Sequence, residues 1–262
     1  MVDELRLDSG TASAIVDPTN GGRISSLVVD GHQLLVVDES AASLQWGAYP
    51  MVPWAGRVRE GRFEFGGIAY QLPCNLPPHS AHGVGFTSAW SLVDDQTITC
   101  ELGPPWPFGG TVVQRFELNE SELLITMTVN AVQDMPVMLG WHPWFVRHME
   151  AGPGRVEAKL SFGNPLMYEL DDSAIPTGLL NSPPPGPWDN CFVWLGRNPV
   201  IEWPGVVELE LSSSCDHWVV YTKPNHALCV EPQSEAPDVF NRAPTVVLAG
   251  DSVDAWFRLR WS

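Results

Sequence analysis

Alternation of apolar and polar residues with a period of two is the feature that most constrains this chain. The clearest stretches are 123–129, 207–211 and 253–261, where nearly every second residue is apolar. In a β-strand such residues point to one face of a sheet, and their neighbours point to the other face. We therefore expect strands that each bury one set of side chains: Leu123, Ile125, Met127 and Val129; Val207, Leu209 and Leu211; and Val253, Ala255, Phe257, Leu259 and Trp261.

Turn signals separate the expected strands. Asp30-Gly31 lies between 24–29 and 33–37, and Gly66-Gly67 lies between 62–65 and 68–72. Such pairs accept the positive φ angles of the two-residue turns that join antiparallel strands. The 24 prolines and 23 glycines are spread along the chain, and no amphipathic helix longer than two turns is evident. The pattern predicts an all-β fold, a large antiparallel β-sandwich of two packed sheets.

The bulk composition fits one domain with a sizeable core. The chain has 262 residues, of which 44% are hydrophobic and 17% are charged. No shift in composition, internal repeat or low-complexity tract divides it. The proline-rich stretch 181–187 is flanked by alternating segments, which favours a surface loop over a linker. We expect a single domain spanning 1–262.

Net charge and cysteine usage restrict partners and compartment. A net charge of −17 argues against nucleic acid and anionic membranes as partners, because both would repel the chain. The five cysteines form no CxxC pair, which favours reduced thiols. The N-terminus is acidic and lacks an apolar signal region, and no apolar run is long enough to span a membrane. These features predict a cytoplasmic protein.

Four short segments concentrate ionisable residues among glycine, proline and aromatic residues. They are 53–57 with Arg57, 79–83 with His82, 140–145 with His142, and 230–234 with Glu231. A fifth segment, 187–192, contains Asp189. We expect all five at strand ends or in loops, where a rigid sandwich can present functional groups.

The order of these segments resembles the aldose 1-epimerase (galactose mutarotase) family from about residue 15 to the C-terminus. The matching stretches, in family order, are Asn20-Gly21-Gly22-Arg23-Ile24, Pro53-Trp54-Ala55-Gly56-Arg57-Val58 followed by Gly61-Arg62-Phe63, His82-Gly83 with Trp90 downstream, Trp141-His142-Pro143-Trp144-Phe145, Ile175-Pro176-Thr177-Gly178, Asp189-Asn190-Cys191-Phe192, and Glu231-Pro232-Gln233. Each is weak alone, but seven in family order are a specific signal.

The resemblance implies an isomerase that interconverts the α and β anomers of a free aldose on a β-sandwich. Glu231 would be the general base and His142 the general acid, with His82 able to share proton delivery. His82, Arg57 and Asp189 would bind and orient the sugar. Trp54 and Trp144 are added as substrate-binding candidates because they neighbour candidate site residues in sequence. The pair would act as carboxylate and imidazolium on opposite sides of the reacting C1–O5 unit. No cofactor is implied.

Departures from the family pattern bear on the substrate. The chain has Pro143-Trp144-Phe145 where many members have a Tyr-Phe-Asn type of sequence, and Gly56 where Asn often precedes the arginine. The hexose 6-phosphate branch tends to carry arginine soon after its His-Gly, and 83–90 contains none. An unphosphorylated sugar is favoured. A non-catalytic sugar-binding or sensor protein and a hexose 6-phosphate epimerase are the alternatives.

Several of these residues also have purely structural explanations. His142 between two tryptophans could be a core histidine, and Asp189 fits ordinary turn chemistry. His79 and His82 lack an acidic or sulfur partner nearby in sequence, so we expect no metal site. His32, His148, His217 and His226 lie outside any motif and are expected to be structural or surface residues.

Overall fold

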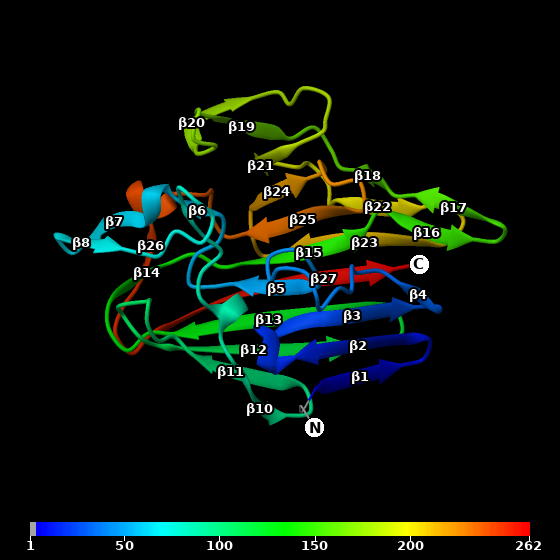
Figure 1. Ribbon diagram of the computed structural model, residues 1–262, viewed down its shortest axis with the longest axis horizontal. Coiled ribbons are helices and arrows are strands. Elements are labelled where there is room, and N and C mark those ends of the chain that lie inside the picture. The colour runs from blue at the N-terminus through cyan, green and yellow to red at the C-terminus, as the bar shows by residue number, and fades with distance from the viewer. Residues whose placement is uncertain (1–3) are drawn as a thin grey trace.

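The computed structural model describes residues 4–262, and two large antiparallel sheets dominate it (Figure 1). The first sheet has 11 strands in the order β1-β2-β3-β5-β15-β25-β24-β21-β19-β20, with β4 paired to β3. Their bounds are β1 Leu5–Ser9, β2 Ala12–Asp17, β3 Arg23–Val29, β4 His32–Gln33, β5 Ala48–Met51, β15 Gly140–Val146, β19 Leu166–Leu170, β20 Pro176–Asn181, β21 Asp189–Val193, β24 His217–Tyr221 and β25 Ala227–Gln233.

The second sheet has eight strands in the order β10-β11-β12-β13-β27-β23-β22-β18. Their bounds are β10 Ser91–Asp94, β11 Thr97–Glu101, β12 Thr111–Leu118, β13 Glu122–Asn130, β18 Lys159–Ser161, β22 Val200–Trp203, β23 Val207–Ser213 and β27 Ser252–Trp261. Contacts between aromatic rings join the two sheets. The ring centroid of Phe257 on β27 lies 5.9 Å from that of Trp141 on β15 and 6.4 Å from that of Trp218 on β24. The predicted antiparallel β-sandwich is confirmed.

Four two-stranded sheets and four short 3₁₀ helices complete the described chain. The small sheets pair β6 Arg57–Val58 with β9 Ser80–Ala81, β7 Arg62–Phe65 with β8 Ile68–Gln71, β14 Met135–Val137 with β26 Thr245–Val247, and β16 His148–Ala151 with β17 Gly154–Glu157. The 3₁₀ helices are η1 Pro18–Asn20, η2 Arg59–Gly61, η3 Gly85–Thr87 and η4 Val239–Asn241. Within 4–262 there is no α-helix.

The period-two alternation places the core between the two large sheets. In β13 the residues Leu123, Ile125, Met127 and Val129 are all inaccessible to solvent, and their neighbours are partly exposed. The same alternation in β27 buries Phe257 and Leu259, which pair across the ladder with Ile125 and Leu123. Each such side chain contributes roughly 1.5–3 kcal/mol on burial. The apolar pattern thus fixes which face of each strand turns inward.

Both predicted hairpins are present. Asp30 and Gly31 have φ angles of 49° and 80° between β3 and β4, and Gly66 and Gly67 have φ angles of 59° and 76° between β7 and β8. The strand expected over 33–37 is shorter than predicted, since β4 ends at Gln33. The proline-rich stretch 181–187 forms a connection between β20 and β21, which belong to the same sheet.

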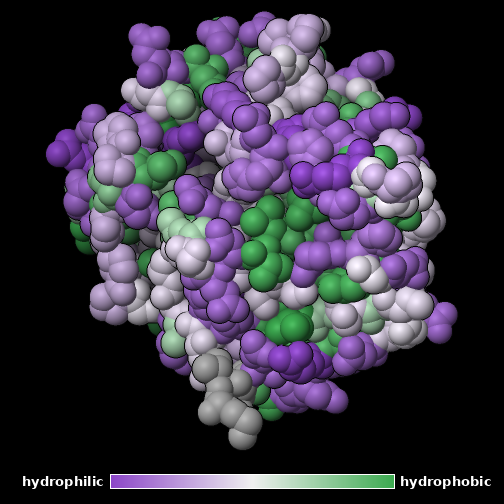
Figure 2. All heavy atoms as spheres, turned by 45° about the vertical axis from the view of Figure 1, so that its right-hand side comes forward, coloured by the Kyte–Doolittle hydropathy of each residue, from purple (hydrophilic) through white to green (hydrophobic). Residues whose placement is uncertain are grey.

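One face of the molecule can be judged for its polarity in a space-filling view. Figure 2 shows polar side chains over most of the face turned forward, with apolar side chains gathered in a patch near its centre. In the part of the chain that the structure describes, no helix has the length and apolar character needed to cross a membrane.

Candidate functional site

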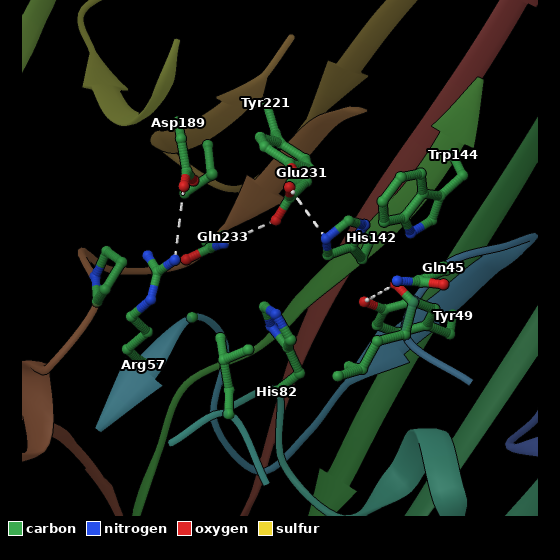
Figure 3. Close-up of a pocket in the computed structure, with 15 residues that line it drawn as sticks. Gln45, Tyr49, Arg57, His82, His142, Trp144, Asp189, Tyr221, Glu231 and Gln233 are labelled. Atoms are coloured by element: carbon green, nitrogen blue, oxygen red, sulfur yellow. Dashed lines mark hydrogen bonds and ion pairs between the residues drawn. The ribbon is translucent and has the colours of Figure 1, made fainter. Parts of the chain in front are cut away.

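The central strands of the 11-stranded sheet have one face that points away from the sandwich core. This face forms the floor of a cavity of about 230 Å³ (Figure 3). This is below the roughly 300–1,000 Å³ of pockets for drug-sized ligands, a size suited to a single sugar ring. The lining residues are Leu44, Gln45, Tyr49, Gly56, Arg57, Leu76, His82, His142, Trp144, Asp189, Val219, Tyr221, Glu231, Gln233 and Pro237.

Strand β15 places His142 at the centre of the floor. Its residues Trp141 and Phe145 turn into the sandwich core, so His142 and Trp144 turn to the opposite face. Tyr49, the partner of His142 on β5, stacks on the imidazole with ring centroids 4.8 Å apart. Trp144 stacks on it at 5.3 Å and an interplanar angle of 13°. The two aromatic rings hold the imidazole plane in place.

Strand β25 places Glu231 against His142. Glu231 and Gln233 share a face of the strand, and both are buried, with 2% and 0% exposure. The Nε2 atom of His142 lies 3.2 Å from Oε1 of Glu231. The amide Nε2 of Gln233 donates to Oε2 of Glu231 at 3.3 Å. The carboxylate therefore has one partner on each oxygen, as the dashed lines in Figure 3 show.

The short β6–β9 ladder brings Arg57 and His82 to the same wall of the cavity. Arg57 pairs with Ala81, and the backbone N–H of His82 donates to the carbonyl of Gly56 at 3.0 Å. His82 has a φ of 65°, a left-handed conformation that is uncommon outside glycine and is found at functional sites. Its ring meets that of His142 edge-on at 5.2 Å.

Asp189 stands at the opposite side of the cavity from His142. It begins β21 and pairs with Tyr221 of β24. Its Oδ2 lies 3.5 Å from the guanidinium of Arg57 and 3.6 Å from Nζ of Lys223. The cavity thus offers a buried imidazole–carboxyl pair at one side and a partly exposed carboxylate–guanidinium pair at the other.

Burial shifts the ionisable groups of the floor toward their neutral forms. Burial raises the pKa of Glu231 well above its usual range, and the negative charge of Asp189 raises it further. Burial also lowers the pKa of His142 well below its usual range, with a contribution from His82. The pKa of His82 falls to about 3, through burial and the nearby positive charge of Arg57. Burial therefore opposes the carboxylate and imidazolium forms that the resemblance implies for Glu231 and His142.

The structure brings together most of the residues singled out from sequence. Glu231, His142, His82, Arg57, Asp189 and Trp144 all line the cavity. Trp54 does not: it is 2% exposed and packs on Trp106 at 5.8 Å, outside this cavity. His142 and Glu231 also lie inside strands rather than at strand ends or in loops. They touch each other, whereas the resemblance implies that they act from opposite sides of the C1–O5 unit of a sugar.

Several lining residues were not identified from sequence. Tyr49 and Tyr221 carry no motif, and only their pairing with His142 and Asp189 across neighbouring strands reveals them. Gln233 lies in a matched stretch, and the period of two places it on the same face as Glu231. Two histidines are structural or peripheral: His79 accepts from the N–H of Glu60 and contacts the Ser173 carbonyl, and His226 stacks on Trp144.

Gly83 fixes the loop that carries His82, which leads to a testable prediction. Its φ is 76°, and a Cβ at this position would lie 2.0 Å from the carbonyl oxygen of Val52. We expect Gly83→Ala to destabilise the protein by about 1–3 kcal/mol and to weaken sugar binding, because the loop must shift. Thermal unfolding measures the loss. Gly67→Ala is the matched control for a left-handed glycine in open space, and an equal loss there would contradict the proposed close contact.

Comparisons with a family model, with curated relatives and with solved structures all indicate the same family. Residues 3–260 match the model of the family described as aldose 1-epimerase. The uncharacterized protein YphB of Escherichia coli K12 is 27% identical over 239 residues, which cover 78% of each chain. Galactose mutarotase of Mus musculus is 29% identical over 136 residues, covering 48% of this chain and 40% of the mouse protein. A solved structure from Escherichia coli K12, assigned provisionally to the aldose 1-epimerases, has a TM-score of 0.84 at 21% identity and covers 99% of both chains.

Proposed function

This chain belongs to the aldose 1-epimerase family, and we propose that it interconverts the α and β anomers of a free aldose. The observation that carries the proposal is the contact of His142 with Glu231 on the floor of a sugar-sized cavity. Burying two ionisable groups costs several kcal/mol, and binding of a neutral sugar requires neither of them. Proton transfer requires both. The pair therefore favours an enzyme over a protein that only binds sugar.

The proposed reaction moves two protons. Glu231 removes the proton from the O1 hydroxyl while His142 delivers a proton to the ring oxygen O5. The C1–O5 bond breaks, C1 becomes an aldehyde, and rotation about C1–C2 exposes its other face. Return of both protons closes the ring with the opposite configuration. A positioned acid or base contributes about 10²–10⁴-fold.

The shifted pKa values of His142 and Glu231 bear on the energetics of ring opening, because the two groups together hold one proton before and after that step. Ring opening converts a carboxylate and an imidazolium into a carboxylic acid and a neutral imidazole. The second state is the one that burial favours, because it raises the pKa of Glu231 and lowers the pKa of His142. We propose that the buried floor assists ring opening, while sugar hydroxyls stabilise the charged state before it. The two groups titrate as one coupled unit.

The remaining lining residues are proposed to bind and orient the sugar. Arg57 offers a fork of donors, and Asp189 offers acceptors for hydroxyl groups. Trp144 presents an apolar ring beside His142. A pKa of about 3 keeps His82 neutral at working pH, so we assign it to hydrogen bonding with the sugar, and proton delivery to His142.

Charge in the cavity supports an unphosphorylated substrate. Arg57 is the one arginine or lysine among the described lining residues, and its guanidinium is already paired with Asp189. A phosphate carries close to two negative charges and calls for several donors. A hexose 6-phosphate is therefore disfavoured.

Gln233 provides a further prediction. It donates to Glu231, and its own Oε1 is buried without a hydrogen-bond partner in the described structure. Gln233→Met keeps the length of the side chain and removes both polar groups. We expect kcat/KM to fall about 10–100-fold, the value of a hydrogen bond to a charged group. Gln133→Met is the control, since Gln133 is an exposed glutamine that does not line the cavity. Equal effects at both positions would remove Gln233 from the proposed site.

The test of the proposed function is the rate of anomer interconversion for a panel of sugars. Proton NMR follows freshly dissolved α-D-glucose, α-D-galactose and glucose 6-phosphate with and without protein. We expect acceleration for at least one free aldose and little for the phosphate. Binding of several sugars without acceleration would favour a sugar-binding protein, and acceleration restricted to the phosphate would favour a hexose 6-phosphate epimerase.

A further inference from the structure

A sulfur atom lies beside the proposed acid–base pair. Cys229 and Glu231 are two residues apart on β25 and share its cavity-facing side, and His142 lies on the neighbouring strand β15. One donor atom from each of His142, Cys229 and Glu231 lies within 4.8 Å of the others. No sequence pattern links His142, Cys229 and Glu231, because the three residues meet only in the folded sheet.

The chemistry of this set suits a thiophilic divalent cation. Imidazole nitrogen, thiolate sulfur and carboxylate oxygen are the three donor types of zinc sites. A thiolate ligand discriminates against magnesium and calcium, which prefer oxygen. A carboxylate and a thiolate together balance the charge of Zn²⁺ or Cd²⁺ within a site where each anion alone is costly to bury.

The geometry is close to that of a three-ligand site. Zinc bonds of about 2.1 Å at tetrahedral angles place nitrogen and oxygen ligands about 3.4 Å apart. Nε2 of His142 and Oε1 of Glu231 are separated by 3.2 Å. The three donor atoms lie within 4.8 Å of one another, whereas a zinc–sulfur bond of about 2.3 Å requires sulfur and its neighbouring ligand atoms to be about 3.6 Å apart. Closing the site therefore needs a shift of at most about 1 Å. The fourth position then faces the cavity.

We propose that a cation of the zinc–cadmium class binds His142, Cys229 and Glu231 and blocks the acid–base pair. The bound cation displaces two protons to solvent, the thiol proton of Cys229 and the one proton that the His142–Glu231 pair holds, and it occupies the lone pairs of the imidazole and the carboxylate. Neither group can then accept or deliver a proton. The binding itself does not depend on the proposed function, and only its inhibitory consequence does.

Cadmium titration of the whole protein tests the site without an activity assay. Formation of a cadmium–thiolate bond produces a charge-transfer absorbance in the ultraviolet. We expect saturable binding to the wild-type protein, and at least a 10-fold weaker Cd²⁺ affinity for both Cys229→Ser and His142→Asn. Cys191→Ser is the matched control, because Cys191 is a similarly buried cysteine in the same sheet.

Two results would overturn the proposal. Cd²⁺ affinity that is unchanged in Cys229→Ser, with the thermal unfolding of that variant showing a folded protein, would remove the sulfur from the site. Cys229→Ala provides the same test if the serine variant does not fold. Equal effects of Cys191→Ser and Cys229→Ser would show general thiol binding. Where anomer interconversion is measurable, Zn²⁺ should inhibit it and Mg²⁺ should not, with the inhibition weakened in Cys229→Ser.

Discussion

Glu231→Gln is expected to reduce anomer interconversion about 10²–10⁴-fold while sugar binding remains measurable. The amide keeps the shape of the side chain and its hydrogen bond with Gln233, but it cannot accept the O1 proton. Polarimetry gives the rate, and calorimetric titration with the same sugar gives the affinity. Glu208→Gln on β23 is the control, because Glu208 is an exposed glutamate in the other sheet. A variant with near-normal turnover would exclude Glu231 as the base.

The same substitution has a predicted effect on stability, with a defined dependence on pH. The raised pKa of Glu231 means that the folded state keeps a proton that the unfolded state loses above its ordinary value of 4.5. Stability from this group is therefore full below pH 4.5 and is lost as the pH rises toward the folded-state pKa. Glutamine does not titrate. We expect Glu231→Gln to unfold at a higher temperature than wild type at pH 8, and the difference to shrink toward pH 4.5.

His142→Asn is expected to have the second large effect, also about 10²–10⁴-fold on kcat. Asparagine fits the space but cannot carry the proton to O5. His82→Asn is the matched comparison, since asparagine tolerates the left-handed backbone of that position. We expect it to raise KM more than it lowers kcat. The reverse ranking, with His82→Asn inactive and His142→Asn active, would move the acid to His82.

The pH profile of the wild-type enzyme follows from the same pair. Activity requires the His142–Glu231 unit to hold one proton. It should fall at low pH, as a second proton binds below the ordinary histidine pKa of 6.5, because the pKa of His142 is lowered. Activity should also fall at high pH, above the ordinary glutamate value of 4.5, because the pKa of Glu231 is raised. The profile should be bell-shaped, with limits that belong to the coupled pair.

Local sequence patterns predicted the strands and turns because they depend on neighbouring residues. The alternation around Leu123 and Phe257 predicts which face of each strand is buried. The pair Gly66-Gly67 predicts a turn, because glycine accepts positive φ angles. The pairing of β13 with β27, which joins Ile125 to Phe257, has no local signal. The order of strands in each sheet therefore came from the structure.

The residues of the candidate site also fall into two groups: those that a local sequence motif predicts, and those that only the pairing of strands reveals. The matched stretches identified Glu231, His142, Arg57 and Asp189, because each carries its own neighbours in sequence. Tyr49 and Cys229 are defined only by the strands beside them, so the sequence offered no signal for either. Trp54 was chosen for its proximity in sequence to Arg57, but its side chain turns toward Trp106. Proximity along the chain does not decide which face of the backbone a side chain occupies.

The central claim is tested most directly by the mutarotation of freshly dissolved α-D-galactose and α-D-glucose, followed by polarimetry with equal amounts of wild-type protein and Glu231→Gln. We expect wild-type protein to shorten the approach to anomeric equilibrium for at least one sugar, in proportion to the protein concentration. We expect the variant to leave the spontaneous rate unchanged. Equal acceleration by both proteins would contradict the assigned chemistry, and no acceleration of any free aldose would contradict the proposed function.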